Sequence, residues 1–281
     1  MSLERTTDST RRFPGRVLSS PPSAAVLSRR DRLLILGCVV LSTLLAWAYL
    51  FHLDRQMSAD MEYDKMMAAM GMNMNMPWRP TDFFFTFAMW AVMMIGMMGP
   101  SAAPMLLLFA TARGGGGGGD KRGLSLTTLA FALGYIAVWA GFSVGAAAAQ
   151  WGLHQAAMLS AVLASSSSRL SGTILMAAGA YQLTPWKSKC LTRCRTSLGF
   201  LITSWRDGAE GAFRMGFRHG TYCLGCCWAL MCVLFVVGVM NLIWVAVLTG
   251  FVLIEKTGPA GTLVSRVAGT AMLILGVMAF V

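Results

Sequence analysis

The sequence predicts an all-α protein, a polytopic transmembrane helical bundle of about seven helices. Three observations carry this prediction. The mean hydropathy is +0.61 and 56% of the 281 residues are hydrophobic, a composition that does not suit a surface facing water. Apolar runs of roughly 18 or more residues, long enough to cross a hydrocarbon core of roughly 30 Å, recur along the chain. Charged residues make up only 12% of the chain and are confined to short segments between these runs.

The predicted elements follow one another in order. Residues 1–32 contain seven Arg together with Ser, Thr and Pro, so we expect a disordered, basic cytoplasmic arm. Residues 33–281 form the predicted transmembrane domain. Its first apolar run is interpreted as a retained helix, because no small-residue cleavage site follows it. The predicted spans are Leu33–Phe51, Phe83–Ala110, Leu124–Ala149, Met158–Leu183, Tyr222–Val239, Leu242–Ile254 and Gly261–Val281.

Two of these boundaries depend on turn signals. The apolar stretch from Tyr222 to Ile254 is too long for a single crossing, and Gly238 and Asn241 near its middle favour a tight hairpin between two helices. A run of serines interrupts the fourth span, so its helix is expected to begin near Arg169.

The basic residues give this bundle an orientation. With the N-terminus inside, the predicted cytoplasmic segments hold 19 of the 23 Lys and Arg residues, which favours an N-in, C-out topology in a bacterial inner (plasma) membrane. Residues 52–82 are then an external Met-rich loop and residues 185–221 a cytoplasmic loop. The net charge of +11 is explained by this topology, and no basic helix or aromatic-basic array indicates nucleic acid as a partner.

Methionines are concentrated in the predicted external loop. A thioether is a soft, neutral ligand that favours Cu(I), and it forms no disulfide in an oxidising compartment. An alternating run of Met and Asn has no apolar helical face, so packing explains it poorly. The candidate external copper ligands are Met57, Met61, Met70, Met72, Met74 and Met76.

The second predicted span continues this pattern. Met89, Met93 and Met97 recur every four residues and share one helix face, directly before Gly99-Pro100. We interpret this stripe as a candidate metal route, with ordinary helix packing as the alternative.

The thiols gather on the opposite, predicted cytoplasmic side. Their spacing of one helical turn puts pairs of them on one helix face, and together with an imidazole they offer a ligand set for Cu(I), with Zn(II) as the alternative. Neighbouring Lys and Arg are expected to lower the thiol pKa values. No nucleophile–base set or Walker loop indicates an enzyme. The candidate internal ligands are Cys190, Cys194, His219, Cys223, Cys226 and Cys227.

Three segments carry a resemblance to a known family. Trp90–Pro104, Gly179–Arg195 and His219–Lys256 resemble the bacterial predicted metal-binding integral membrane protein family, domain of unknown function 2182. The similarity covers about residues 33–281. It implies a multi-helix inner-membrane protein with a metal role, and it brings no established reaction.

Three functional hypotheses follow. The leading hypothesis is copper handling, either transport or delivery to a membrane enzyme, from external methionines to an internal thiolate site. The second is a thiol-disulfide redox carrier, since the chain has a more distant likeness to the thiol-redox membrane proteins of cytochrome c biogenesis. The third is a non-catalytic subunit of a larger membrane complex, with another membrane protein as its partner.

Overall fold

A computed structural model of the chain describes residues 27–70, 79–114, 121–156 and 168–280. Throughout these ranges the protein is helical and contains no strand, which confirms the all-α prediction. The elements are α1 (Arg29–Ala69), α2 (Pro80–Gly114), α3 (Lys121–Gln155), α4 (Ser168–Gln182), α5 (Pro185–Arg195), α6 (Ser197–Ser204), α7 (Gly208–Cys232), α8 (Leu234–Val237), α9 (Leu242–Thr257) and α10 (Gly261–Phe280).

Five helices in the described ranges are long and apolar enough to cross a membrane. The predicted number of spans was about seven. The fourth and sixth predicted spans correspond to α4 and α9, which have only 15 and 16 residues and fall short of the length that a straight crossing needs. The five candidate spans are Arg29–Ala59, Pro80–Gly114, Gly123–Gln155, Gly208–Val237 and Gly261–Ala279.

The two segments predicted to lie between spans are largely helical. Helix α1 continues to Ala69 through the first part of the predicted loop 52–82, because this polar segment is rich in Met and Ala and has no Gly or Pro before Gly71. The predicted loop 185–221 forms α5, α6 and the first half of α7, which begins at Gly208 instead of Tyr222. Hydropathy marks where a chain is apolar, while a helix can extend well beyond its apolar part.

One of the two turn signals is confirmed. Helix α4 is described from Ser168, directly after residues 157–167, which lie outside the described ranges, so its expected start near Arg169 stays a prediction. The apolar stretch after α7 turns at Gly238, whose φ of 98° favours glycine, and the Asn241 side chain then caps α9 by accepting a hydrogen bond from the Trp244 backbone N–H. This turn sends α9 back along α7, so the end of α9 returns to the level of the cysteines.

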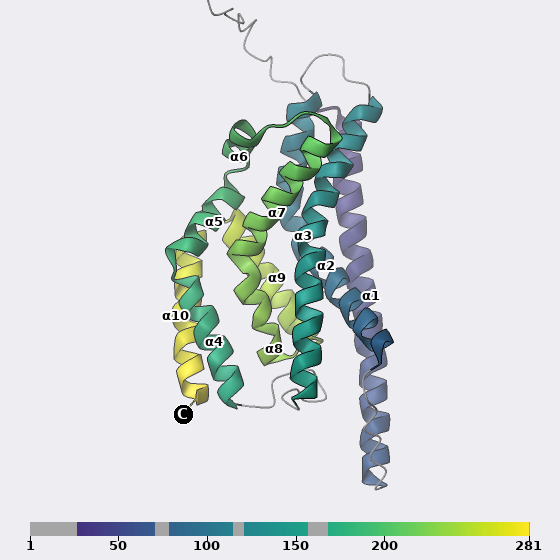
Figure 1. Ribbon diagram of the computed structural model, residues 1–281, viewed down its shortest axis with the longest axis vertical. Coiled ribbons are helices and arrows are strands. Elements are labelled where there is room, and N and C mark those ends of the chain that lie inside the picture. Colours follow the sequence, from purple (N-terminus) through teal and green to yellow (C-terminus); the bar gives the residue numbers. More distant parts are fainter. Residues whose placement is uncertain (1–26, 71–78, 115–120, 157–167, 281) are drawn as a thin grey trace, which may run out of the picture.

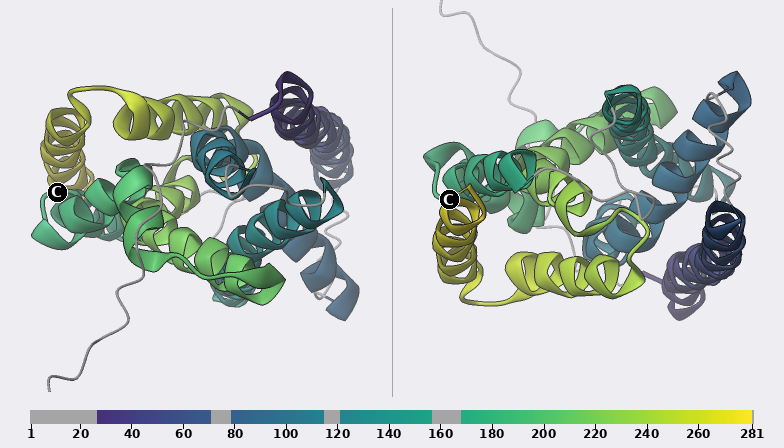
Figure 2. Two further views of the ribbon diagram at one scale, coloured as in Figure 1. Left: turned by 90° about the horizontal axis from the view of Figure 1, so that it is seen from above. Right: turned by 90° about the horizontal axis from the view of Figure 1, so that it is seen from below.

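The helices form a bundle with α1 at one side and the α4–α10 pair at the other (Figures 1 and 2). Helix α3 packs along α7, α4 along α10, and α1 along α2, while α2 also contacts α3 and α9. Apolar residues from α2, α3, α5, α7 and α9 share one buried core. The interior of the bundle is therefore built around α2, α7 and α9.

Glycines let α3 and α7 approach closely. A methyl group added at Gly216 would lie 1.9 Å from the Phe131 carbonyl oxygen, and one added at Gly134 would lie 2.1 Å from the Phe213 carbonyl oxygen. No side chain fits at either position. This contact brings the α7 cysteines against α3.

Candidate metal centre

Two helices bring the separate cysteine blocks together. Helix α5 begins at Pro185. The Thr184 hydroxyl caps this helix by accepting a hydrogen bond from the Lys187 backbone N–H at 3.3 Å. Helix α5 packs on α7, so that Cys190 Sγ lies 3.0 Å from the position a Cβ would take at Gly225. The absence of a side chain at Gly225 makes room for the Cys190 thiol.

The α7 thiols form the inner part of this group. Cys223, Cys226 and Cys227 are each only 1% exposed. The Cys226 and Cys227 thiols donate to the Cys223 carbonyl oxygen at 3.1 and 2.7 Å, and their own Sγ atoms lie 3.7 Å apart. Cys194 of α5 is buried in the same core, close enough to Cys223 and Cys226 to interact with both thiols. We call Cys190, Cys194, Cys223, Cys226 and Cys227 the thiol cluster.

A lysine from α9 reaches into the thiol cluster. Lys256 Nζ lies 2.9 Å from Cys223 Sγ and 3.1 Å from Ser101 Oγ, with the Met98 Sδ atom 3.7 Å away. On the other side, Tyr135 Oη lies 3.0 Å from the same Cys223 Sγ. The core therefore holds a monovalent cation, the ammonium group, at the point where thiol and thioether sulfur atoms meet.

The other charged residue at the end of α9 is also buried. The sequence left open whether Glu255 and Lys256 pair with each other or reach toward the membrane surface. In the structure Glu255 pairs with Lys187 of α5 at 2.5 Å, with side-chain exposures of 0% and 1%. Lys187 also donates to the Gln182 Oε1 atom. Each α9 charge therefore has its own partner, and neither reaches the surface.

His219 lies one turn before Cys223 in an aromatic environment. Its ring is 2% exposed and packs against the rings of Phe131, Tyr135 and Phe200, with centroids 6.2, 5.9 and 5.6 Å away. Its Nδ1 atom has no hydrogen-bond partner in the described part of the chain. Tyr135 touches both the imidazole ring and the Cys223 thiol, so His219 lies behind this phenol as seen from the thiol cluster.

The methionine stripe of α2 points into the bundle. Met89 is 5% exposed, and Met93 and Met97 are fully buried, as are Met94 and Met98 on the neighbouring stripe. All five belong to the same core as the thiol cluster. Buried thioethers thus lead along α2 to Met98 and the Lys256 ammonium group.

The predicted external methionines are only partly described. Met57 is half-buried and packs against the main core, and Met70 is exposed just after α1. Met61 is a residue of α1, but its side chain lies outside the described part of the structure. Met72, Met74 and Met76 lie outside the described residues altogether.

The pKa values of the two α5 thiols are raised, whereas the sequence predicted that basic neighbours would lower them. Burial, followed by the charge of Cys226, raises the pKa of the Cys190 thiol. Hydrogen bonds to Cys223 and Cys226, followed by burial, raise the pKa of the Cys194 thiol well above its ordinary value. The charge of Arg193 does lower the pKa of Cys190, and that of Lys256 lowers the pKa of Cys194, but burial and the neighbouring thiols outweigh both. These two thiols therefore hold their protons at neutral pH.

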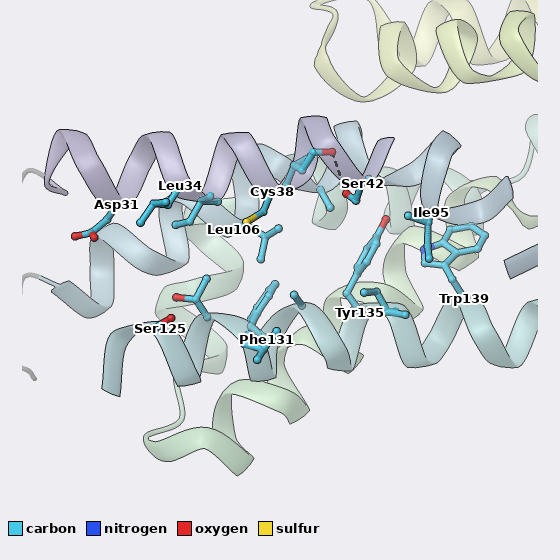
Figure 3. Close-up of a pocket in the computed structure, with 18 of the residues that line it drawn as sticks. Asp31, Leu34, Cys38, Ser42, Ile95, Leu106, Ser125, Phe131, Tyr135 and Trp139 are labelled. Carbon is cyan, nitrogen blue, oxygen red and sulfur yellow. Dashed lines mark hydrogen bonds between the residues drawn. The ribbon is translucent and has the colours of Figure 1, made fainter. Parts of the chain in front are cut away.

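An apolar cavity of about 540 Å³ adjoins the centre (Figure 3). It lies between α1, α2 and α3, and its wall includes Cys38, Met94 and Tyr135. Because the Tyr135 hydroxyl contacts Cys223 Sγ, one side chain separates the cavity from the thiol cluster.

The sequence did not indicate Tyr135 or Ser101 as residues of the centre, because neither residue type is a typical metal ligand.

The present contacts of the thiols determine how a metal ion could bind to the cluster. Within the described ranges, no three His, Cys, Asp or Glu side chains are arranged as a ready metal site. The thiols instead bond to one another, to a backbone carbonyl oxygen and to Lys256. A soft cation entering the cluster would have to displace the ammonium group and the thiol protons.

The fold and the centre define a class: an all-helical protein whose apolar core holds a cluster of thiols beside buried thioethers. The family model described as copper chaperone matches residues 87–279, and the chain belongs to this family, PpoB2. No curated protein and no solved structure matches the chain. The matched region contains the α2 methionines and the whole thiol cluster, whereas Met57–Met76 precede it.

Proposed function

We propose that the chain is a membrane-embedded Cu(I)-binding protein that passes copper between methionine thioethers and the thiol cluster. The observation that carries the proposal is the position of Lys256 Nζ, which contacts Cys223 Sγ at 2.9 Å and lies 3.7 Å from Met98 Sδ. Thiol and thioether sulfurs are the ligands that select Cu(I), a soft monovalent cation. A site that stabilises the monovalent ammonium group of Lys256 has the electrostatic environment that the monovalent Cu(I) ion requires.

The family membership supports copper as the cargo. In this proposal the inner ligands are the thiols of Cys194, Cys223, Cys226 and Cys227. Cys190 lies at the edge of this group. Copper moves along α2 by binding to the thioethers of Met89, Met93 and Met97. His219, which lies behind Tyr135, is a further candidate ligand. The external methionines Met57, Met61, Met70, Met72, Met74 and Met76 capture the ion first. Zn(II) is the alternative metal for the thiols.

Exposed apolar side chains support the membrane location. Leu33, Leu41 and Leu44 of α1 are 59–62% exposed, and only 11% of the most apolar window of α1 is buried. Val267 and Ile274 of α10 are similarly open. Apolar faces of this length would be unstable in water, while lipid chains would cover them without cost.

Copper titration of the purified chain in detergent tests the proposal. The wild type should retain Cu(I) against a chromophoric Cu(I) chelator, and the C194S/C223S double variant should lose at least about tenfold in affinity, since two of the proposed soft ligands become hard ones. The C38S/C232S double variant is the matched control, because Cys38 and Cys232 lie outside the thiol cluster. Equal retention by both variants, or no retention by the wild type, would refute the proposal.

The thiol contacts also support a second candidate, a thiol-disulfide carrier. The Cys194 thiol lies beside those of Cys223 and Cys226, so small movements would let a pair form a disulfide while a disulfide of a partner protein is reduced in exchange. This function requires that replacing one thiol traps a mixed disulfide with a partner protein. Non-reducing gels of C194S and C226S variants, compared with C232S, would reveal that adduct, whereas copper binding alone yields none.

A further inference from the structure

A second polar site lies where α4 ends and where α5 and α10 begin. A pocket of about 360 Å³ opens there, beside the buried Lys187–Glu255 pair. Figure 1 shows these three helix ends at the same level of the bundle. The polar residues that line the pocket are Gln182, Ser188, Lys189, Thr262, Ser265 and Arg266.

Gln182 offers unused donors at this pocket. Its side chain is 2% exposed, and its Oε1 atom accepts from Lys187 Nζ. An ammonium group can only donate, so this contact fixes the amide oxygen toward Lys187 and leaves the amide NH₂ on the other side. The Nε2 atom has no hydrogen-bond partner among the described residues. A buried NH₂ without a partner costs free energy, which a ligand with acceptor oxygens would recover.

The charges around the pocket are positive. The first turns of α5 and α10 both line it, and each helix N-terminus carries a partial positive charge. Lys189 and Arg266 make no ion pair within the described part of the chain. Glu255 does not oppose them, because Lys187 neutralises it. Two full positive charges and two helix N-termini therefore face one cavity.

We propose that this pocket binds a phosphate group, either in the headgroup of an anionic phospholipid or as the free anion. A phosphate group presents mainly acceptor oxygens near neutral pH, which matches donors from Gln182, the Thr262 hydroxyl and the two basic residues. The Ser188 and Ser265 hydroxyls already donate to the carbonyl oxygens of Thr184 and Gln182. Leu183 lines the pocket and is 44% exposed, and Trp186, which follows the lining residue Pro185 in the chain, is 75% exposed, so apolar side chains near the pocket suit a lipid. This proposal does not depend on copper binding. Only the phospholipid alternative depends on the proposed membrane location of the chain.

Native mass spectrometry of the delipidated full-length chain tests the pocket with phosphatidylglycerol and, separately, phosphatidylcholine. We expect the wild type to bind phosphatidylglycerol at least about tenfold more tightly than the K189Q/R266Q variant, since each basic residue near a phosphate contributes about a factor of five. The R206Q/R214Q variant removes the same charge from exposed positions outside the pocket and should bind as the wild type does. Equal losses in both variants, or no loss in either, would overturn the proposal.

Thermal unfolding with added inorganic phosphate separates the two sources. A rise in melting temperature that the K189Q/R266Q variant loses supports the free anion, and phosphatidylglycerol binding without such a rise supports the headgroup. The Q182M variant removes the buried donor and should weaken whichever ligand binds. Because Gln182 also contacts Lys187, the K189Q/R266Q result decides the matter if Q182M fails to fold.

Discussion

The buried Lys187–Glu255 pair links α5, which carries Cys190 and Cys194, to α9, which carries Lys256. Both side chains are essentially inaccessible, and neither carboxylate oxygen of Glu255 makes a well-aligned hydrogen bond in the described part of the chain. Replacing Glu255 by Gln leaves the Lys187 ammonium group buried without a counter-charge. Removing one partner of a buried ion pair costs about 3–5 kcal/mol, or roughly two to three and a half orders of magnitude in the unfolding equilibrium.

The assay is unfolding of the chain in mixed micelles by increasing dodecyl sulfate, followed by tryptophan fluorescence. The E255Q variant should unfold at much lower dodecyl sulfate than the wild type, and the K187M/E255L double variant should recover most of the loss, since neither charge remains. The control is E210Q, which breaks the exposed Glu210–Arg214 pair and should cost no more than about 0.5 kcal/mol. An E255Q variant as stable as E210Q would refute this reasoning.

Three further predictions concern packing and protonation. The G216A variant should separate α3 from α7, because its Cβ would lie 1.9 Å from the Phe131 carbonyl oxygen, and it should unfold well before G141A, where the added methyl group meets open space. In a variant whose only thiol is Cys190, maleimide labelling should reach its half-maximal rate at a higher pH than for glutathione, because burial raises this pKa and only the thiolate reacts. A half-maximal rate at or below the pH found for glutathione would contradict the raised pKa. With pKa values of Cys190 and Cys194 raised, apparent copper affinity should also increase as pH rises from 6 to 8, by up to about tenfold per pH unit for each proton displaced.

Much of the fold could be predicted from hydropathy and turn chemistry. The helical class and the turn at Gly238 and Asn241 followed from apolar runs and local signals. The length of α1 and the early start of α7 could not be predicted in this way, because polar residues continue a helix when no breaker intervenes. The membrane orientation remains a prediction from the basic residues.

The candidate metal centre, like the fold, could be predicted from the sequence only in part. The spacing within each cysteine block placed the thiols on common helix faces, and the structure brings the two blocks together through α5 and α7. Lys256, Tyr135 and Ser101 could not be assigned, because their contacts join helices that are far apart in the chain. Their roles follow from the packing of α2, α3 and α9, which depends on tertiary contacts that no local pattern encodes.

X-ray absorption at the copper edge, on the Cu(I)-loaded chain in detergent, tests the central claim most directly. The account predicts monovalent copper in a shell of sulfur alone, and fewer sulfur ligands in the C194S/C223S variant but not in C38S/C232S. A shell dominated by nitrogen or oxygen, or one that the C194S/C223S variant leaves unchanged, would contradict the assignment of copper to the thiol cluster.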